Sequence, residues 1–305
     1  MRISTNTMYQ SGISKISDMQ ASQVKLQTQI STGKRIQSPS DDPIASARAL
    51  NTQQAQNINS QFASNRVETK SQLTAQESTL SNITELIVNT QANLVAAGNQ
   101  AYSDTERGYM ADDLNNAIDQ LLSYANTRDA DGNYMFSGNQ TATQAFTKTA
   151  TGATYQGDSG QRLVQVASDR QLAINTSGDN VFQGGGNDIF TTLTSLVTLL
   201  KTPVTNTATR TALTAGLTTL TGNLKSSLDN VLNIRADAGS KLNELDALDK
   251  AGDDRALQYA KNLADLQDLD YAKAVSDISQ QKIILEAAQQ TFVKTTGLTL
   301  FNYIN

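Results

Sequence analysis

Two long segments of the sequence contain neither glycine nor proline, and this feature limits the fold more than any other. The first lies between Pro43 and Gly98, and the second lies between Gly252 and Gly297. Because glycine and proline are the residues that most often interrupt a helix, both segments can form continuous helices. At about 1.5 Å per residue, the first segment alone predicts a rod on the order of 80 Å long.

The residues that flank these segments predict where the helices begin and end. Asp42 before Pro43 is typical of an N-cap followed by proline at the first helical position. A neighbouring Asp41 that complements the helix dipole explains this carboxylate pair more simply than acid–base catalysis does. Gly252 followed by Asp253 predicts that one helix stops at the glycine and that another begins at the aspartate.

Apolar residues in and around these segments recur every seven positions. Helices with this spacing bury a narrow apolar stripe against one another, although an ordinary amphipathic helix can also show a single such stripe. The stripes lie toward both ends of the chain, so we expect the terminal helices to pack together. Their members are Ile16, Met19, Leu26 and Ile30; Leu73, Leu80, Ile87 and Leu94; Leu217, Leu224, Val231, Ala238 and Leu245; and Ala264, Tyr271, Ile278, Leu285 and Phe292.

The middle of the chain has a different character. From about residue 138 to residue 186 it is rich in Thr, Gly, Gln and Ser. Apolar residues alternate over residues 164–174 on either side of Ser168-Asp169, which predicts a β-hairpin. After the glycines at 184–186, apolar residues between Leu193 and Leu200 predict a short helix.

These patterns predict a mainly α fold. We expect a long antiparallel helical bundle or coiled coil formed by the N- and C-terminal segments, with a small β-rich domain inserted in the middle. The expected parts are an N-terminal assembly helix (1–38), the N-terminal half of a helical core domain (39–138), a β-rich outer domain (139–190), the C-terminal half of the core domain (191–264) and a C-terminal assembly helix (265–305).

The residue types that the chain lacks exclude most catalytic sites. It contains no Cys, His or Trp, so a His-bearing triad, a thiol nucleophile, and the usual zinc and haem ligand sets are excluded. A net charge of -5 argues against a dedicated nucleic-acid binder. The hydrophobic fraction of 38% is low beside the usual roughly 45–50%, which is typical of elongated helices with narrow apolar stripes. We therefore expect no catalytic residue, no cofactor and no metal site.

Targeting signals are equally sparse. The first ten residues are too polar for the apolar region of a signal peptide, and no stretch approaches the roughly 18 apolar residues of a membrane span. We expect no cleaved signal peptide and no insertion into a membrane.

Two motif-like segments lack residues that their chemistry needs. Gly33-Lys34 differs from a phosphate-binding loop, because Thr28 stands where the first glycine is required and Arg35 where a hydroxyl residue is required. The segment that begins at Asp129 lacks the glycine and the glutamate of a calcium loop, so a turn after a helix is the favoured interpretation.

The remaining candidate is an interaction surface. The terminal stripes have little to bury against within one chain, and a partner chain would supply the missing surface. Gln23, Gln267 and Gln281 at core-type positions indicate seams whose register is specified by buried polar groups. The residues predicted to pack between subunits are Ile16, Met19, Leu26, Ile30, Ala264, Tyr271, Ile278, Leu285 and Phe292.

The segment after the first predicted helix resembles a known signature. Residues 31–36 (STGKRI) and 38–45 (SPSDDPIA) look like the N-terminal signature of the bacterial flagellar hook-associated protein 3 family, the hook-filament junction proteins related to flagellin. The similarity continues through 131–138, 228–236 and 297–301, and so covers both terminal thirds. Flagellins usually continue with Ala-Ala-Gly after the paired aspartates, so Pro43-Ile44 and the GNYMFSG run favour the junction proteins. The signature residues are Gly33, Lys34, Arg35, Pro39, Asp41, Asp42 and Pro43.

The resemblance implies a structural adaptor subunit of the flagellum. It would join the hook, through hook-associated protein 1, to the flagellin filament by coiled-coil polymerisation into a homo-oligomeric ring. The resemblance further implies type III export, a cytoplasmic export chaperone and an extracellular location at the hook-filament junction. The alternatives are flagellin itself, another self-assembling coiled-coil scaffold, and an enzyme or sugar-binding module built on the middle insert.

Overall fold

The computed structural model describes residues 5–97 and 102–297, so residues 298–301 of the C-terminal similarity lie outside the described residues. The fold is mainly α with a small β insert, as the sequence predicts. The helices are α1 (Thr5–Thr32), α2 (Pro43–Ala97), α3 (Asp104–Ala125), α4 (Gly178–Phe182), α5 (Ile189–Lys201), α6 (Thr207–Gln267) and α7 (Tyr271–Gly297), with a 3-10 turn η1 (Gly184–Gly186). The strands are β1 (Phe146–Thr149), β2 (Gly152–Tyr155), β3 (Leu163–Ala167) and β4 (Arg170–Ala173).

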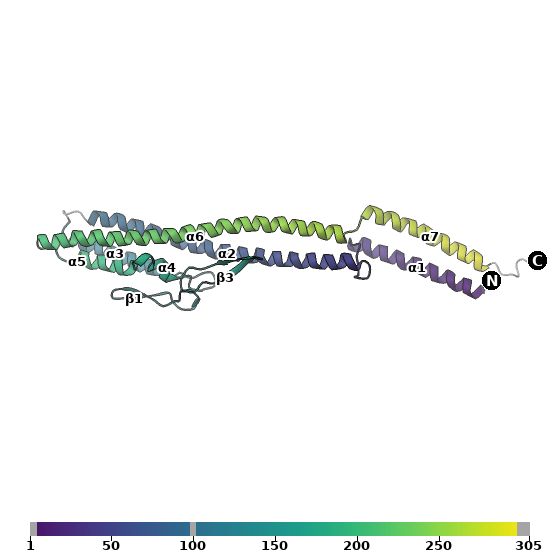
Figure 1. The fold of residues 1–305 in the computed structure, drawn as a ribbon, viewed down its shortest axis with the longest axis horizontal. Helices are drawn as coiled ribbons and strands as arrows, with labels where there is room; N and C mark the ends of the chain where they lie inside the picture. Colours follow the sequence, from purple (N-terminus) through teal and green to yellow (C-terminus); the bar gives the residue numbers. More distant parts are fainter. Residues whose placement is uncertain (1–4, 98–101, 298–305) are drawn as a thin grey trace, which may run out of the picture. The chain divides into compact units, whose positions relative to one another are not determined.

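The chain divides into two compact units, which we describe separately. The terminal-helix unit consists of residues 1–58 and 254–305, and the middle unit consists of residues 59–253. Helices α2 and α6 contribute residues to both (Figure 1). The division of the chain into five functional parts stays a prediction.

Helix α2 begins where the sequence predicts. The Asp42 carboxylate accepts a hydrogen bond from the backbone N–H of Ala45 at 3.0 Å, and Pro43 is the first helical residue. This bond satisfies one of the N–H groups that the first helical turn leaves without a partner. The long helix then continues without interruption to Ala97.

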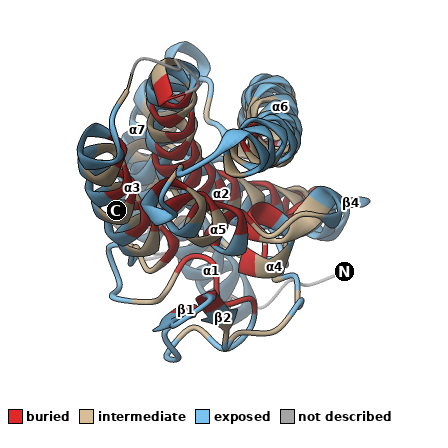
Figure 2. Cartoon of the chain, turned by 90° about the vertical axis from the view of Figure 1, so that its left-hand side faces the viewer, coloured by how far each residue is buried: buried red, intermediate tan, exposed pale blue. Residues whose placement is uncertain are grey.

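The heptad stripes of α2 and α6 are buried, as their spacing predicts. Leu80, Leu224 and Leu245 are fully covered, and the other members of the two middle stripes are nearly so. Ion pairs flank the contact between the antiparallel helices, and Arg235 binds the Glu77 carboxylate at 2.6 Å. Helices α3 and α5 lie beside them, and Figure 2 shows the buried residues of α2, α3 and α5 in red.

Aromatic rings from the insert complete the larger core of the middle unit. Phe146 of β1 lies at centroid distances of 5.2 Å from Phe182 of α4 and 5.2 Å from Phe190 of α5. Phe136 meets Phe182 edge to face at 5.6 Å, and all four rings are buried. Rings of this size contribute much of the apolar area that a small insert can bury.

The insert contains two antiparallel hairpins, whereas the alternation of apolar residues predicted one. The predicted hairpin is β3–β4, and it turns at Ser168-Asp169. The hairpin β1–β2 escaped prediction because its strands of four residues bury only the residues at one end. The predicted short helix is α5.

Hairpin β3–β4 packs on α2 and α6 through a second, smaller apolar cluster. Val166 and Leu172 of the hairpin contact Leu73 and Leu245 of the two helices. A buried arginine lies beside this cluster: Arg66 of α2 is 3% exposed and binds Asp249 of α6 at 2.5 Å. Its guanidinium also donates to the carbonyl of Val166 at 3.0 Å, so one side chain connects three elements.

The predicted helix stop at Gly252-Asp253 is wrong, because α6 continues through both residues to Gln267. Gly252 serves a different purpose. A Cβ atom at this position would lie 2.5 Å from Nη2 of Arg66, so the absence of a side chain makes room for the buried guanidinium. Asn59 donates a hydrogen bond to the Gly252 carbonyl at 2.9 Å. These contacts offset the roughly 1 kcal/mol that glycine costs inside a helix relative to alanine.

We predict that Gly252→Ala destabilises the protein, although alanine is the better helix former. Arg66 cannot move aside without losing both Asp249 and the Val166 carbonyl, and a buried guanidinium left without partners is costly. The matched control is Gly239→Ala in the same helix, where a Cβ meets nothing within 4 Å. The control variant Gly239→Ala should raise the free energy of unfolding by about 0.5–1 kcal/mol. Urea unfolding of the two variants checks this, and equal stabilisation by both would contradict it.

Candidate interaction site

The terminal-helix unit is built on an antiparallel pair, α1 and α7, which approach each other closely (Figure 1). Gly12 of α1 allows the approach at one end. A Cβ atom there would lie 2.5 Å from the Phe292 ring of α7, and the same ring lies 5.2 Å from the ring of Tyr9. The pair therefore has a seam in which an aromatic ring fits over a glycine.

The subunit-packing residues predicted from the sequence are mostly half-buried in the single chain. Half-buried members on α1 are Ile16, Met19, Leu26 and Ile30, and those on α6 and α7 are Ala264, Ile278, Leu285 and Phe292. Tyr271 differs, because it is 53% exposed. Among the described residues of α7 only Ala274 is buried, and no described side chain of α1 is. The predicted residues thus lie toward the seam, and the seam alone does not enclose them.

A second set of apolar residues covers the outer sides of the pair, and heptad analysis missed it. A helix that is apolar on more than one side is usually covered on more than one side. The available signal was the number of apolar residues outside the heptad positions. Outside the heptad positions, the exposed large apolar side chains are Met8, Ile13 and Val24 on α1 and Val275, Ile283, Ile284 and Val293 on α7.

Two grooves run between α1 and α7. The first has a volume of about 520 Å³ and is lined by apolar or small residues such as Ile16, Ile284, Ala288 and Phe292. The second, of about 340 Å³, is more polar and includes Gln281. The Gln281 side-chain oxygen is buried without a hydrogen-bond partner among the described residues.

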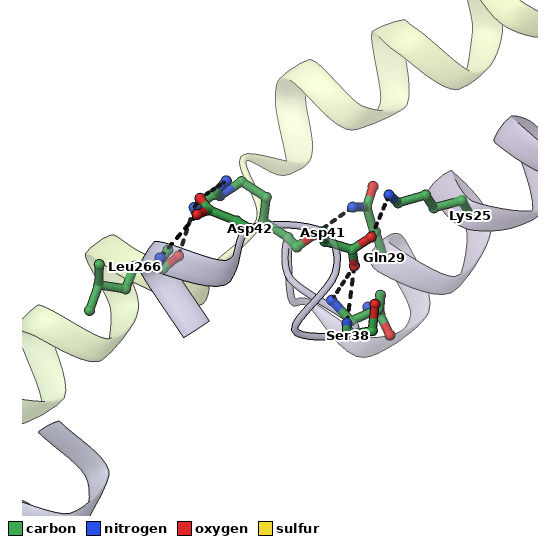
Figure 3. A network of polar contacts seen from close by, with 9 residues as sticks. Lys25, Gln29, Ser38, Asp41, Asp42 and Leu266 are labelled. Carbon is green, nitrogen blue, oxygen red and sulfur yellow. Dashed lines mark hydrogen bonds and ion pairs between the residues drawn. The ribbon is translucent and has the colours of Figure 1, made fainter. Parts of the chain in front are cut away.

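The signature residues form the loop between α1 and α2, and Asp41 organises that loop (Figure 3). Its carboxylate accepts hydrogen bonds from the N–H groups of Gln37 and Ser38, each at 3.0 Å. The ammonium group of Lys25 binds the other carboxylate oxygen at 2.6 Å. Asp41 and Asp42 therefore have separate structural roles, one in the loop and one at the cap of α2.

The loop also bonds to the break between α6 and α7. The N–H of Arg35 donates to the Gln267 carbonyl at 2.7 Å, and the N–H of Leu269 donates to the Gly33 carbonyl at 3.0 Å. The Arg35 guanidinium donates to the Leu266 carbonyl at 3.0 Å (Figure 3). These bonds satisfy carbonyl groups at the end of α6, which would otherwise lack helical partners.

Gly33 is required by both conformation and space. Its φ is +71°, in the region that favours glycine, and a Cβ atom would lie 2.8 Å from the hydroxyl oxygen of Tyr271. The backbones of Lys34 and Asp268 form an isolated antiparallel β-bridge. Pro39 lies in the loop, and Pro43 is the first residue of α2. The structure therefore brings the signature residues together around one junction of the chain.

Charge and hydrogen bonding lower the pKa values of both Asp41 and Asp42. The bond from Lys25, followed by those from the N–H groups of Ser38 and Gln37, lowers the pKa of Asp41 from 3.8 to about 2. The N–H of Ala45 lowers the pKa of Asp42. Both groups are held in their ionised form, as structural acceptors need to be.

The segment that begins at Asp129 forms a turn, as the sequence favours. The Asp129 carboxylate accepts hydrogen bonds from the N–H groups of Asp131 and Asn133, at 3.0 and 2.8 Å, and so forms a turn. Within residues 5–97 and 102–297, acidic residues form no group that could hold a metal ion. Over the same ranges no helix combines the length and apolarity that crossing a membrane requires.

Comparisons with known proteins agree with this architecture. Residues 3–141 match the family model of the bacterial flagellin N-terminal helical region. The chain is 37% identical to flagellar hook-associated protein 3 of Escherichia coli (strain K12) over 315 aligned positions, which cover 99% of each. A solved flagellar hook-associated protein of Vibrio parahaemolyticus is 27% identical, with a TM-score of 0.68 over 75% of this chain and 100% of that one. The flagellar junction protein FlgL of Legionella pneumophila, 22% identical, shares the fold with a TM-score of 0.64 over 72% of this chain and 100% of that one.

The paired terminal helices, the bonded loop and the flagellin-type N-terminal region define a helical structural protein of the flagellin-related class. Within that class the full-length similarity decides the family. The chain belongs to the flagellar hook-associated protein 3 family, and it is a structural component of the bacterial flagellum. The comparisons thus favour the junction proteins over flagellin, as the signature does.

We predict that Lys25→Met raises the pKa of Asp41 toward 3.8, because Lys25 is the largest cause of its depression. The depressed pKa means that Asp41 stabilises the loop above pH 3.8, and that this contribution disappears as pH falls through about 2. Carboxyl chemical shifts followed by NMR during acid titration measure the change. Lys15→Met, on the same helix, is the control and should leave the Asp41 titration unchanged. An unchanged midpoint in Lys25→Met would contradict the proposed ion pair.

Proposed function

We propose that this chain is a structural adaptor subunit that joins the flagellar hook to the flagellin filament. Its α1–α7 pair would form the contact with neighbouring copies in a homo-oligomeric ring. The observation that carries the proposal is the large apolar surface left exposed on both helices, with Ile283 and Val293 each 68% exposed. Exposed apolar surface of this extent marks an interaction site, because burying each large side chain contributes about 1.5–3 kcal/mol.

The two grooves show how a second copy would fit. The groove of about 520 Å³ offers apolar contacts along Ile16 and Phe292. The more polar groove contains Gln281, whose buried oxygen needs a donor. A neighbouring subunit would bury the outer apolar side chains, and a turn of the Gln281 side chain toward the contact would let that subunit donate to its oxygen. The predicted packing residues and the glutamines at core-type positions take these roles in the proposal.

The signature loop would hold the assembly helices in the arrangement that the lattice requires. Arg35 and Gly33 bond to the α6–α7 break, Asp41 holds the loop to Lys25 of α1, and Asp42 caps the first turn of α2. Residues 1–38 and 265–305 would act as the assembly segments under this proposal. The helical core and the β-rich outer domain, residues 139–190, would lie between them in the sequence.

Partners and location follow from family membership and are part of the same proposal. The chain would contact hook-associated protein 1 on the hook side and flagellin on the filament side. Before export through the type III apparatus, a cytoplasmic chaperone would cover the C-terminal helix, whose apolar side chains are exposed in the single chain. The mature subunit would then lie outside the cell, at the hook-filament junction.

We also propose that the chain is not an enzyme. Its relatives are structural flagellar proteins, and the sequence contains no His or Cys. The perturbed carboxyl groups, Asp41 and Asp42, are committed to backbone hydrogen bonds and ion pairs. A catalytic carboxylate would instead need access to a substrate in a cleft.

We predict that Ile283→Glu abolishes filament attachment. The exposed position lets the single chain keep its fold, while a charge in the proposed contact prevents the burial that assembly requires. A strain that lacks the native chain and carries the variant should export the protein, keep its hooks, and release flagellin into the medium. Motility and the protein content of sheared flagella measure this outcome.

The matched control is Val67→Glu in the middle unit. Val67 is 67% exposed, nearly the same as Ile283, and also lies on a helix. Circular dichroism should show equal helicity for both variants, and Val67→Glu should retain motility. Normal filaments with Ile283→Glu, or equal loss in both variants, would refute the assignment of the contact to the α1–α7 pair.

A further inference from the structure

A small cleft lies where the insert meets α2 in the middle unit. Its volume is about 20 Å³. Gln72 and Gln76 of α2 line one side, and Asp129, Arg162 and Asn175 are among the residues that line the rest, together with Met135 and Ile174. Nothing in the adaptor function described above uses this cleft.

Three of the lining side chains carry buried polar atoms that have no hydrogen-bond partner in the described part of the chain. They are Oε1 of Gln72, Nε2 of Gln76 and Nε of Arg162. Gln76 is only 3% exposed, so bulk water cannot satisfy its amide. Such groups are costly when left unpaired, and three around one cleft indicate a common partner.

The orientation of Gln72 is settled by a neighbour. Its side-chain nitrogen donates to the Glu68 carboxylate at 2.8 Å, so its oxygen is the atom left without a donor. The residues that line the cleft therefore carry one unpaired acceptor, on Gln72, and two unpaired donors, on Gln76 and Arg162.

The charges at the cleft are also balanced. Arg162 and Asp129 both line it, yet they form no direct ion pair within residues 5–97 and 102–297. One Asp129 oxygen is occupied by the turn, where it accepts from Asp131 and Asn133. The second oxygen has a single long contact, 3.5 Å from the Asn133 amide, and retains the capacity to accept. Oppositely charged groups separated in this way are commonly bridged by solvent.

We propose that this cleft binds one ordered water molecule. The water accepts hydrogen bonds from Gln76 Nε2 and Arg162 Nε, and donates to Gln72 Oε1 and the Asp129 carboxylate. Two donors and two acceptors match the tetrahedral capacity of water, and the volume exceeds the roughly 10–15 Å³ that one water needs. The Asp129 carboxylate disfavours an anion, and the Arg162 guanidinium disfavours a cation.

The water would attach the insert to the helix. Gln72 and Gln76 lie on α2, Arg162 immediately precedes β3, and Asp129 follows α3. One bridging molecule therefore connects three separate segments of the middle unit. The joint is polar and adds to the nearby apolar contact of Val166 and Leu172 with Leu73.

The sign of a stability change tests this proposal in the full-length chain. With the water in place, Gln76→Met removes one of its four bonds and places a thioether beside it, so the midpoint of thermal unfolding should fall. If the amide were simply unpaired, the same change would remove a costly buried group and the midpoint would rise. Gln61→Met is the matched control, because Gln61 is exposed on the same helix and unit, and its midpoint should match that of the native chain.

A second variant tests whether the water is shared. Arg162→Met should also lower the midpoint of thermal unfolding. The double variant should lower this midpoint by less than the sum of the two single decreases, because both substitutions weaken the binding of the same water molecule. A raised midpoint in Gln76→Met, or strictly additive losses, would overturn the proposal.

A crystal structure of the full-length chain at a resolution that defines ordered solvent gives the direct test. The expected result is one solvent peak within hydrogen-bond distance of Gln72, Gln76 and Arg162, with no anomalous signal after a bromide soak. A bromide peak would identify an anion site and overturn the proposal. Direct bonds among the three side chains, or a cleft without density, would overturn it as well.

Discussion

A narrow apolar stripe along a long helix is the constraint on which the structure depends. Such a stripe can be buried against one neighbour, and the chain meets this requirement differently in its two units. In the middle unit, α2 and α6 cover each other, and α3, α5 and the insert fill the remaining surface around Leu80 and Phe146. In the terminal-helix unit, α1 and α7 pack against each other, and Ala274 is the sole buried residue of α7 among those described. One unit has a core of its own, and the other leaves most of its apolar side chains half-buried or exposed.

Short-range rules predicted much of this fold because they act within a few residues. The proline at position 43 and the carboxylate before it locate the start of α2, and the seven-residue spacing of Leu217 to Leu245 identifies the buried side of α6. Gly252 shows where these rules fail. The glycine is typical of a helix end, but its role depends on Arg66, which lies far away in the sequence and approaches only after the chain folds. No local pattern contains that information.

The candidate site was predictable to a similar extent. The half-buried members of the α1–α7 seam follow from heptad spacing, whereas the outer residues such as Ile283 and Val24 fall outside it and were missed. The contacts of the signature loop could not be derived from spacing either. Asp41 caps backbone N–H groups four and three residues earlier, but Arg35 reaches the carbonyls of Leu266 and Gln267, a pairing that only the folded chain displays.

The bonds between this loop and the end of α6 also bear on the order of folding. Arg35 and Gln267 are separated by most of the sequence, so during synthesis their contact cannot form until nearly the whole chain has been made. The middle unit, by contrast, is complete at residue 253. Contacts between residues so distant in sequence carry a large loop-closure cost unless intervening structure already brings them together. Because the middle unit is complete first, helices α1 and α7 would be the last helices to become ordered.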